Sequence, residues 1–146
     1  MNPKIIVINP EKCSKCNDCV NVCREIHGIS RVRKYNNVPM FCMQCEKAPC
    51  KEVCPVGAIY LKENIPIVNK EKCIGCGMCV IACPIGAIFI EDKVAHKCTL
   101  CLDTDRVSPA CVEACKDRAL ILVTDETLEL YKEERRKKIL DVLKQE

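Results

Sequence analysis

The sequence has no tryptophan, and aromatic residues make up only 3% of its 146 residues. A conventional hydrophobic core in a chain of this length would contain more of these large side chains, which bury the most surface per residue. The shortage therefore predicts that something other than aromatic side chains fills part of the interior. It argues against an ordinary globular domain that is stabilised by side-chain packing alone.

Long apolar runs are also missing. The apolar run near the N-terminus, residues 5–8, has only four residues, and neither a small-residue cleavage site nor a twin-arginine pair accompanies it. No stretch approaches the roughly 18 apolar residues that a membrane span needs. We therefore expect a cytoplasmic protein without a direct membrane span.

Neither sign of charge dominates the sequence. Lysine and arginine total 23, aspartate and glutamate total 20, and the formal net charge is +3. The basic residues are not interleaved with aromatic residues, as they are in many nucleic-acid-binding surfaces. A mixed, solvated surface is the simplest interpretation, and no nucleic-acid partner is predicted.

What the sequence does have is sixteen cysteines. A short chain so rich in cysteine is a secreted disulfide scaffold, a zinc array or an iron–sulfur protein. In a cytoplasmic protein, thiols usually serve metals or catalysis rather than disulfides. The cysteines fall into four groups of four with none left over: Cys13, Cys16, Cys19 and Cys23; Cys42, Cys45, Cys50 and Cys54; Cys73, Cys76, Cys79 and Cys83; and Cys98, Cys101, Cys111 and Cys115.

The third group gives the most specific signal. It has the spacing C-x₂-C-x₂-C-x₃-C-P, ending at Cys83 and Pro84, which is typical of bacterial ferredoxins. Three cysteines at every third position can wrap three corners of one cubic cluster, while the fourth binds the neighbouring cluster. Structural zinc sites instead use two separated pairs around one ion, and three closely spaced cysteines would crowd it. This group therefore favours [4Fe–4S] clusters.

The other groups depart from that spacing. The second group has two extra residues before Cys50, and the first and fourth groups are followed by Arg24 and Lys116 in place of a proline. The fourth group, with one C-x₂-C pair and one C-x₃-C pair, resembles a zinc site more closely when it is taken alone. A zinc-binding interaction protein therefore stays open as an alternative.

Regular structure should be sparse and repeated. Residues 53–60 (VCPVGAIY) recur as residues 82–89 (ACPIGAIF), and such repeats indicate one structural unit used twice. Short helical turns are expected at 20–23, 51–54, 80–83 and 112–115, each carrying the last cysteine of its group. Runs rich in isoleucine and valine predict strands at 5–8, 58–61, 65–68, 87–90, 93–96 and 119–123. A charged helix is expected at about 125–145, capped by Thr124 or Asp125 and either lightly packed or partner-docking.

Three stretches resemble a known family. They are residues 41–50 (FCMQCEKAPC), residues 53–58 (VCPVGA) and residues 97–101 (KCTLC) leading to 109–115 (PACVEAC). The layout resembles the four-cluster iron–sulfur electron-transfer subunits of the dimethyl sulfoxide reductase type. It is closer still to their small ferredoxin-like relatives, which serve carbon monoxide dehydrogenase, formate dehydrogenase, hydrogenases and tungsten aldehyde oxidoreductases. The resemblance covers residues 5–123.

This resemblance implies an α+β fold of two interleaved bacterial-ferredoxin-like modules, each a pseudo-twofold pair of βαβ units. The outer module would comprise residues 1–37 and 91–123, the inserted central module residues 38–90, and a C-terminal charged helix residues 124–146. It also implies four [4Fe–4S] clusters with crossed ligands. The four ligand sets are Cys13, Cys16, Cys19 and Cys115; Cys98, Cys101, Cys111 and Cys23; Cys42, Cys45, Cys50 and Cys83; and Cys73, Cys76, Cys79 and Cys54.

A family member of this kind would carry single electrons between a catalytic oxidoreductase subunit and a second electron carrier, without catalysis of its own. The sequence also allows a free, diffusible polyferredoxin, which differs in having no partner that co-purifies. An enzyme with a cluster open to substrate is a weaker alternative, because sixteen thiolates for four clusters leave no open iron.

Overall fold

The computed structural model describes residues 1–145, so Glu146 of the predicted helical segment 124–146 lies outside the described residues. The fold is a mixture of short helices and short strands, as the α+β prediction requires. In chain order the elements are β1 (Lys4–Val7), the 3₁₀ turn η1 (Pro10–Lys12), α1 (Asp18–His27), β2 (Arg33–Tyr35), β3 (Val38–Met40), α2 (Pro49–Glu52), β4 (Ile59–Lys62), β5 (Ile65–Val68), α3 (Met78–Ala82), β6 (Phe89–Glu91), β7 (Val94–His96), α4 (Ala110–Ala114), β8 (Leu120–Val123) and α5 (Asp125–Lys144).

The described strands form four two-stranded antiparallel sheets. Three of them are local hairpins, β2–β3, β4–β5 and β6–β7. Each hairpin turns through two residues with positive φ, for example Glu63 and Asn64 between β4 and β5, and this backbone matches the twist of the flanking strands. The fourth sheet pairs β1 with β8, with Ile5 opposite Leu122, and so joins the two ends of the folded body.

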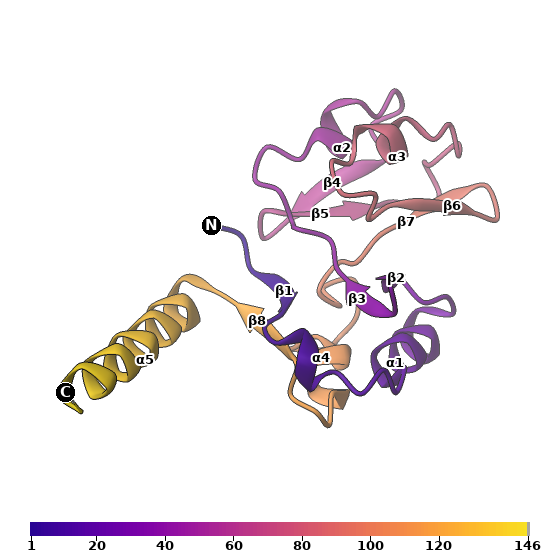
Figure 1. The fold of residues 1–146 in the computed structure, drawn as a ribbon. Helices are drawn as coiled ribbons and strands as arrows, with labels where there is room; N and C mark the ends of the chain where they lie inside the picture. The colour runs from indigo at the N-terminus through magenta and orange to yellow at the C-terminus, as the bar shows by residue number, and fades with distance from the viewer. Residues whose placement is uncertain (146) are drawn as a thin grey trace.

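The elements gather into two bodies, which Figure 1 shows one above the other. The end body contains β1, α1, β2, β3, α4 and β8, and α1 packs against α4 within it. The middle body contains α2, β4, β5, α3, β6 and β7, and α2 packs against α3. Each body has its own cluster of buried apolar side chains, and Ile65 of β5 reaches into the cluster of the end body.

The six predicted strands are present, with bounds that shift by up to two residues. The β2–β3 hairpin was not predicted, and α1 is a helix of ten residues rather than a single turn. The prediction that each helix carries the last cysteine of its group is wrong for α2, α3 and α4, which end before Cys54, Cys83 and Cys115. Pro55 and Pro84 explain two of these ends, because the residue before a proline avoids the helical region.

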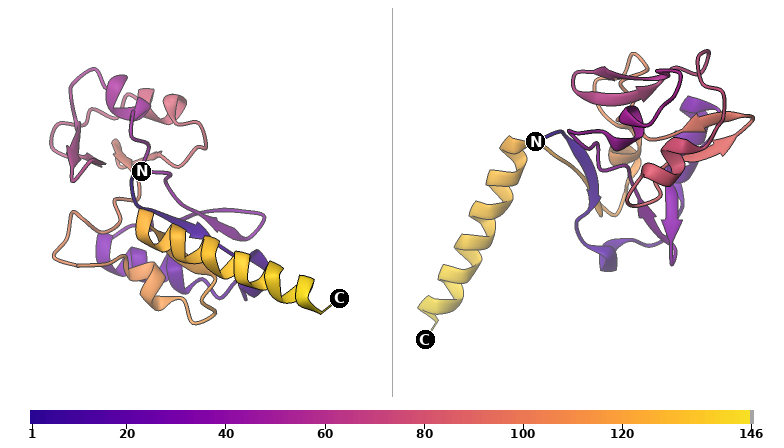
Figure 2. Two further views of the ribbon diagram at one scale, coloured as in Figure 1. Left: turned by 90° about the vertical axis from the view of Figure 1, so that its left-hand side faces the viewer. Right: turned by 90° about the horizontal axis from the view of Figure 1, so that it is seen from above.

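The helix α5 begins at a capping box. The Thr124 hydroxyl accepts a hydrogen bond from the amide of Thr127 at 3.3 Å, and the Thr127 hydroxyl accepts one from the Thr124 amide at 2.7 Å. The helix buries none of its residues, and its main contact is with β8. Of its apolar residues, Leu128 and Tyr131 are half-buried, whereas Ile139 at 60% and Val142 at 62% are exposed. Figure 2 shows α5 extending away from the two bodies.

Among residues 1–145, no helix combines the length and the hydropathy that crossing a membrane requires.

Candidate metal centres

Four cavities in the structure are each lined by four cysteines, so that together they include all sixteen. We name each cavity after one of its cysteines. The Cys13 cavity contains Cys13, Cys16, Cys19 and Cys115; the Cys98 cavity contains Cys98, Cys101, Cys111 and Cys23; the Cys42 cavity contains Cys42, Cys45, Cys50 and Cys83; and the Cys73 cavity contains Cys73, Cys76, Cys79 and Cys54.

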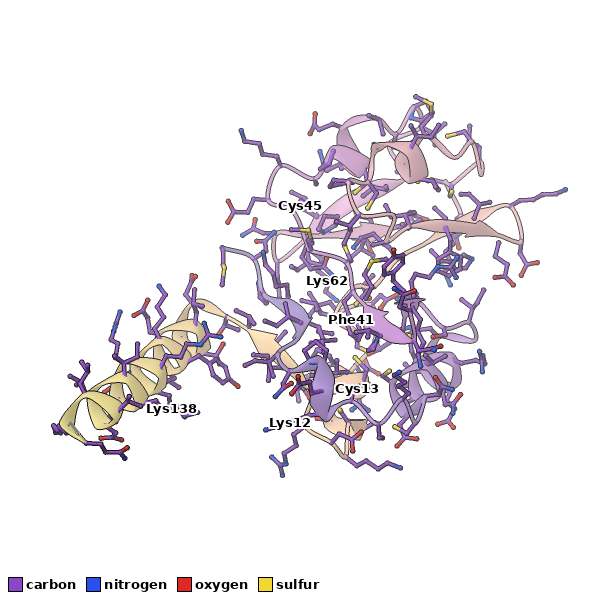
Figure 3. The ribbon with its side chains drawn as sticks, in the orientation of Figure 1. Lys12, Cys13, Phe41, Cys45, Lys62 and Lys138 are labelled. Atoms are coloured by element: carbon purple, nitrogen blue, oxygen red, sulfur yellow. The ribbon has the colours of Figure 1, made fainter. Side chains whose placement is uncertain are left out.

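Every cavity takes three cysteines from one sequence group and its fourth from another. The structure thus brings together the same four sets that the family resemblance implies, although ligation itself stays a prediction. Two cavities belong to each body: Figure 3 labels Cys13 in the end body and Cys45 in the middle body. All sixteen cysteines are free thiols in the described residues.

The loops that carry the first three cysteines of each set contain residues in the left-handed backbone conformation, with positive φ. In the loop of the Cys73 cavity, Gly75 has φ +70° and Gly77 has φ +78°. Glycine adopts this conformation without steric cost. A Cβ on Gly75 would also lie 2.4 Å from the carbonyl oxygen of Lys93, so this glycine is required by the neighbouring β6–β7 turn as well. Non-glycine residues such as Asn17 and Ala48 occupy left-handed positions in other loops.

Backbone amides donate hydrogen bonds to cysteine sulfur atoms around the cavities. The amide of Ala58 lies 3.2 Å from the Cys54 sulfur, and the amide of Ala87 lies 3.3 Å from the Cys83 sulfur. These two contacts occupy equivalent places in the sequence repeat. Donors of this kind stabilise a thiolate and tune the potential of a cluster bound to it. Four further amide–sulfur contacts involve Cys23, Cys42, Cys73 and Cys98.

The pKa values of the thiols follow burial and these amide donors. Burial raises the pKa of Cys50 to about 11 and that of Cys98 to about 12. At Cys54 burial acts in the same direction, but four surrounding backbone amides outweigh it and lower the pKa. Without metal, the buried thiols are therefore protonated at neutral pH. Because metal ligands must be thiolates, loading the cavities with iron has to release protons.

The donor set and the cavity walls fit an iron–sulfur cube. Within residues 1–145, no three histidine, cysteine, aspartate or glutamate side chains converge closely enough to hold a single metal ion. The cysteines surround a volume instead, and the remaining lining of the Cys73 cavity is mainly apolar, including Val56, Ile59 and Val68. Four thiolates around an apolar, amide-rich cavity are the ligands and surroundings that a [4Fe–4S] cluster requires.

The Cys98 cavity also has a charged wall that the sequence analysis did not identify. Arg31, 5% exposed, forms an ion pair of 2.8 Å with Asp103 and donates to the Thr99 hydroxyl at 3.0 Å. His27 lies with Nε2 3.5 Å from the Cys101 sulfur. Burial and the nearby Arg31 guanidinium lower the pKa of His27 to about 4, so its ring is neutral at pH 7. No spacing rule connects these residues to Cys101, so this wall could not be predicted from the sequence.

Comparison with known proteins identifies the class. Residues 33–125 match the 4Fe-4S dicluster domain. The chain belongs to this family, and it is a ferredoxin-type iron–sulfur protein of electron transfer. The match supports [4Fe–4S] clusters rather than zinc.

Three relatives illustrate the range of the family. The chain is 73% identical to an uncharacterized ferredoxin of Methanocaldococcus jannaschii over 146 residues, which cover 100% of this chain and 97% of that relative. It is 36% identical to the thiosulfate reductase electron transfer subunit of Salmonella typhi, over 82% of this chain and 74% of the relative. It is 28% identical to hydrogenase-4 component A of Escherichia coli, over 92% of this chain and 89% of the relative.

Proposed function

We propose that the chain holds four [4Fe–4S] clusters, one in each cavity, and passes single electrons between a catalytic oxidoreductase subunit and a second electron carrier. The observation that carries the proposal is the set of four cavities, each with four cysteines from two sequence groups. The ligand sets are those of the four named cavities. When bound, the clusters supply one-electron chemistry, and the chain holds, insulates and tunes them.

We further propose that the two bodies are two interleaved ferredoxin-like modules, with the middle body inserted into the end body. The pairing of β1 with β8 supports this, because it closes the end body around the insertion. We place the first boundary after Met40, the end of β3, rather than after residue 37, because β3 pairs with β2 and contacts β1 in the end body. We place the second after His96 rather than after residue 90, because Ala95 packs in the core of the middle body and its amide donates to the Cys73 sulfur.

The partner we propose is a catalytic subunit of the carbon monoxide dehydrogenase, formate dehydrogenase, hydrogenase or aldehyde oxidoreductase type. Relatives named as a reductase electron transfer subunit and a hydrogenase component support a partner of this general kind. A groove of about 500 Å³ between α5 and the end body offers a surface for it. Its charged lining is Lys12, Arg118, Arg135 and Lys138 against Glu134 alone, which favours an acidic partner surface. Figure 3 shows Lys12 and Lys138 on opposite sides of this groove.

Iron analysis tests the cluster count. A chain purified without oxygen is expected to contain about sixteen irons and as many sulfides, and to absorb broadly in the visible range, because each cluster contributes about four of each. A colourless preparation that contains zinc, or one with about eight irons, would contradict four clusters. Reconstitution with iron and sulfide, followed by a second count, controls for clusters lost during purification.

Anaerobic co-purification separates a dedicated subunit from a free carrier. A catalytic partner is expected to remain bound at low salt and to dissociate near 1 M salt, where the screening length falls to about 3 Å. Lys138→Glu should weaken its retention about tenfold, because it reverses a charge in the groove. Lys144→Glu is the matched control, since Lys144 is on the same helix but not among the groove residues. Recovery of the chain alone, with diffusible exchange partners only, would instead favour the polyferredoxin.

A further inference from the structure

Lys97 is a lysine whose side chain is fully buried. It is 1% exposed, which places it among the largest fully buried side chains of the described residues. Its ammonium group donates three hydrogen bonds: to Gln44 Oε1 at 3.1 Å, to the Pro66 carbonyl at 2.6 Å and to the Cys98 carbonyl at 2.7 Å. Because an ammonium group has three donors, all of its hydrogen bonds are made inside the protein.

None of the three acceptors carries a negative charge. The ion pairs of the described residues do not include Lys97, whereas the other deeply buried cation, Arg31, is paired with Asp103. A buried charge is costly unless a counter-charge compensates for it. Hydrogen bonds to neutral oxygens orient the ammonium group without cancelling its charge. The structure of the polypeptide alone therefore leaves this charge without an anionic partner among residues 1–145.

The position of Lys97 suggests where that partner comes from. Lys97 lines the Cys42 cavity, and its bond to the Cys98 carbonyl fixes it beside a residue of the Cys98 cavity. Gln44, also 1% exposed, contacts cysteines of the same two cavities. Its backbone amide lies 3.4 Å from the Cys42 sulfur, and its side-chain amide donates to the Cys98 carbonyl at 2.9 Å. Lys97 and Gln44 thus connect one cavity of the middle body with one of the end body.

The hydrogen bonds of the ammonium group reach the walls of both cavities. Pro66, whose carbonyl accepts one of them, lines the Cys42 cavity, and Cys98, whose carbonyl accepts another, lines the Cys98 cavity. One ammonium group therefore lies beside two cavities that belong to different bodies.

We propose that Lys97 is a positioning residue for electron transfer, whose fixed positive charge stabilises the reduced form of the clusters in both the Cys42 and the Cys98 cavities. The inference rests on the proposed function, because it requires clusters in these two cavities. Adding an electron makes a cluster more negative, so a nearby cation raises its reduction potential. Because Lys97 acts on both clusters, it stabilises an electron on either of them. The free-energy difference for electron transfer between these two clusters therefore changes little.

Reduction potentials of the individual clusters test this role. The anaerobic holoprotein and its Lys97→Gln variant are titrated electrochemically and followed by electron paramagnetic resonance, with each signal assigned through single-cysteine variants of each cavity. In Lys97→Gln, the equilibrium constant for reduction of each cluster flanking Lys97 should fall at least about tenfold. This corresponds to a reduction potential lower by about 59 mV for a one-electron couple. The clusters of the Cys13 and Cys73 cavities should shift much less, because the ammonium group hydrogen-bonds no residue that lines either cavity.

Two further variants keep the test decisive. Gln44→Glu places a carboxylate against the Lys97 ammonium group and cancels its charge while Lys97 remains. It should shift the reduction potentials of the same two clusters in the same direction. This variant tests the role of Lys97 even if Lys97→Gln does not fold. Lys62→Gln is the matched control: Lys62 also donates to a carbonyl, that of Leu102 at 2.6 Å, but its side chain is exposed. It should leave all four potentials close to those of the unmodified protein, because water screens the charge it removes.

The outcomes distinguish this inference from the proposed function. Fully loaded variants whose flanking potentials stay unchanged, or shift no more than those of Lys62→Gln, would overturn the role of Lys97 and leave the four clusters in place. An equal shift of all four clusters would overturn it too, since a local charge cannot act uniformly. If the unmodified chain lacked clusters in the Cys42 or Cys98 cavity, the proposed function itself would fail first.

Discussion

Replacing Cys54 by serine is expected to damage or remove the cluster of the Cys73 cavity and to leave the cluster of the Cys42 cavity in place. Cys54 follows Cys50 by four residues, yet its side chain lines the cavity of Cys73, Cys76 and Cys79. The backbone amides around Cys54 hold its thiol pKa low, which prepares it to act as a thiolate ligand. Iron per chain should fall by up to about four of about sixteen atoms. Electron paramagnetic resonance should show the loss of one signal set.

Cys50→Ser is the matched control for this experiment. Cys50 belongs to the same sequence group as Cys54 but lines the Cys42 cavity. Its replacement should damage the complementary cluster, so that the two variants lose different signals. A Cys54→Ser protein that lost the Cys42 cluster instead would show that each group binds its own cluster, and it would contradict crossed ligation.

Spacing in the sequence predicts the parts of this protein that depend on neighbouring residues. The third cysteine group, from Cys73 to Cys83, has a spacing that only a few kinds of site use, so a cluster could be predicted there. The hairpins β4–β5 and β6–β7 follow from short isoleucine-rich and valine-rich runs around turns. The sets that join distant groups, such as Cys13 with Cys115, are not encoded in any spacing. They could be predicted only from the resemblance to a family.

The residues that sequence analysis missed act through contacts between distant segments. Arg31 meets Thr99 across 68 residues, and Lys97 meets Gln44 across 53. A lysine beside a cysteine has the same appearance in the sequence whether it is solvated or buried, so only the packing identifies Lys97. The β2–β3 hairpin was missed for a related reason: Arg33, Lys34 and Tyr35 do not alternate between apolar and polar, and this strand buries none of its residues.

Removing iron is expected to abolish the native fold of both bodies. Cysteines that line the cavities are themselves members of the buried cores, with Cys111 in the end body and Cys50 and Cys79 in the middle body. The four cysteine-lined cavities therefore lie where an ordinary protein would have packed side chains. When such cavities stay unfilled, their walls lose dispersion contacts. In small metal-binding domains of this kind, the free energy of metal binding is folding free energy.

Anaerobic chelation followed by circular dichroism and hydrogen exchange measures this dependence. The apoprotein should lose amide protection in β1–β8 and β4–β5, since the first sheet closes the end body and the second covers the Cys73 cavity. The helix α5 does not hold the two bodies together, because it buries none of its residues and most helical stability in proteins comes from tertiary packing. Iron and sulfide should restore protection, whereas zinc should not, because no three ligands of the described residues converge on one ion. An apoprotein that kept native protection in both sheets would show that the polypeptide folds around its cavities without the clusters.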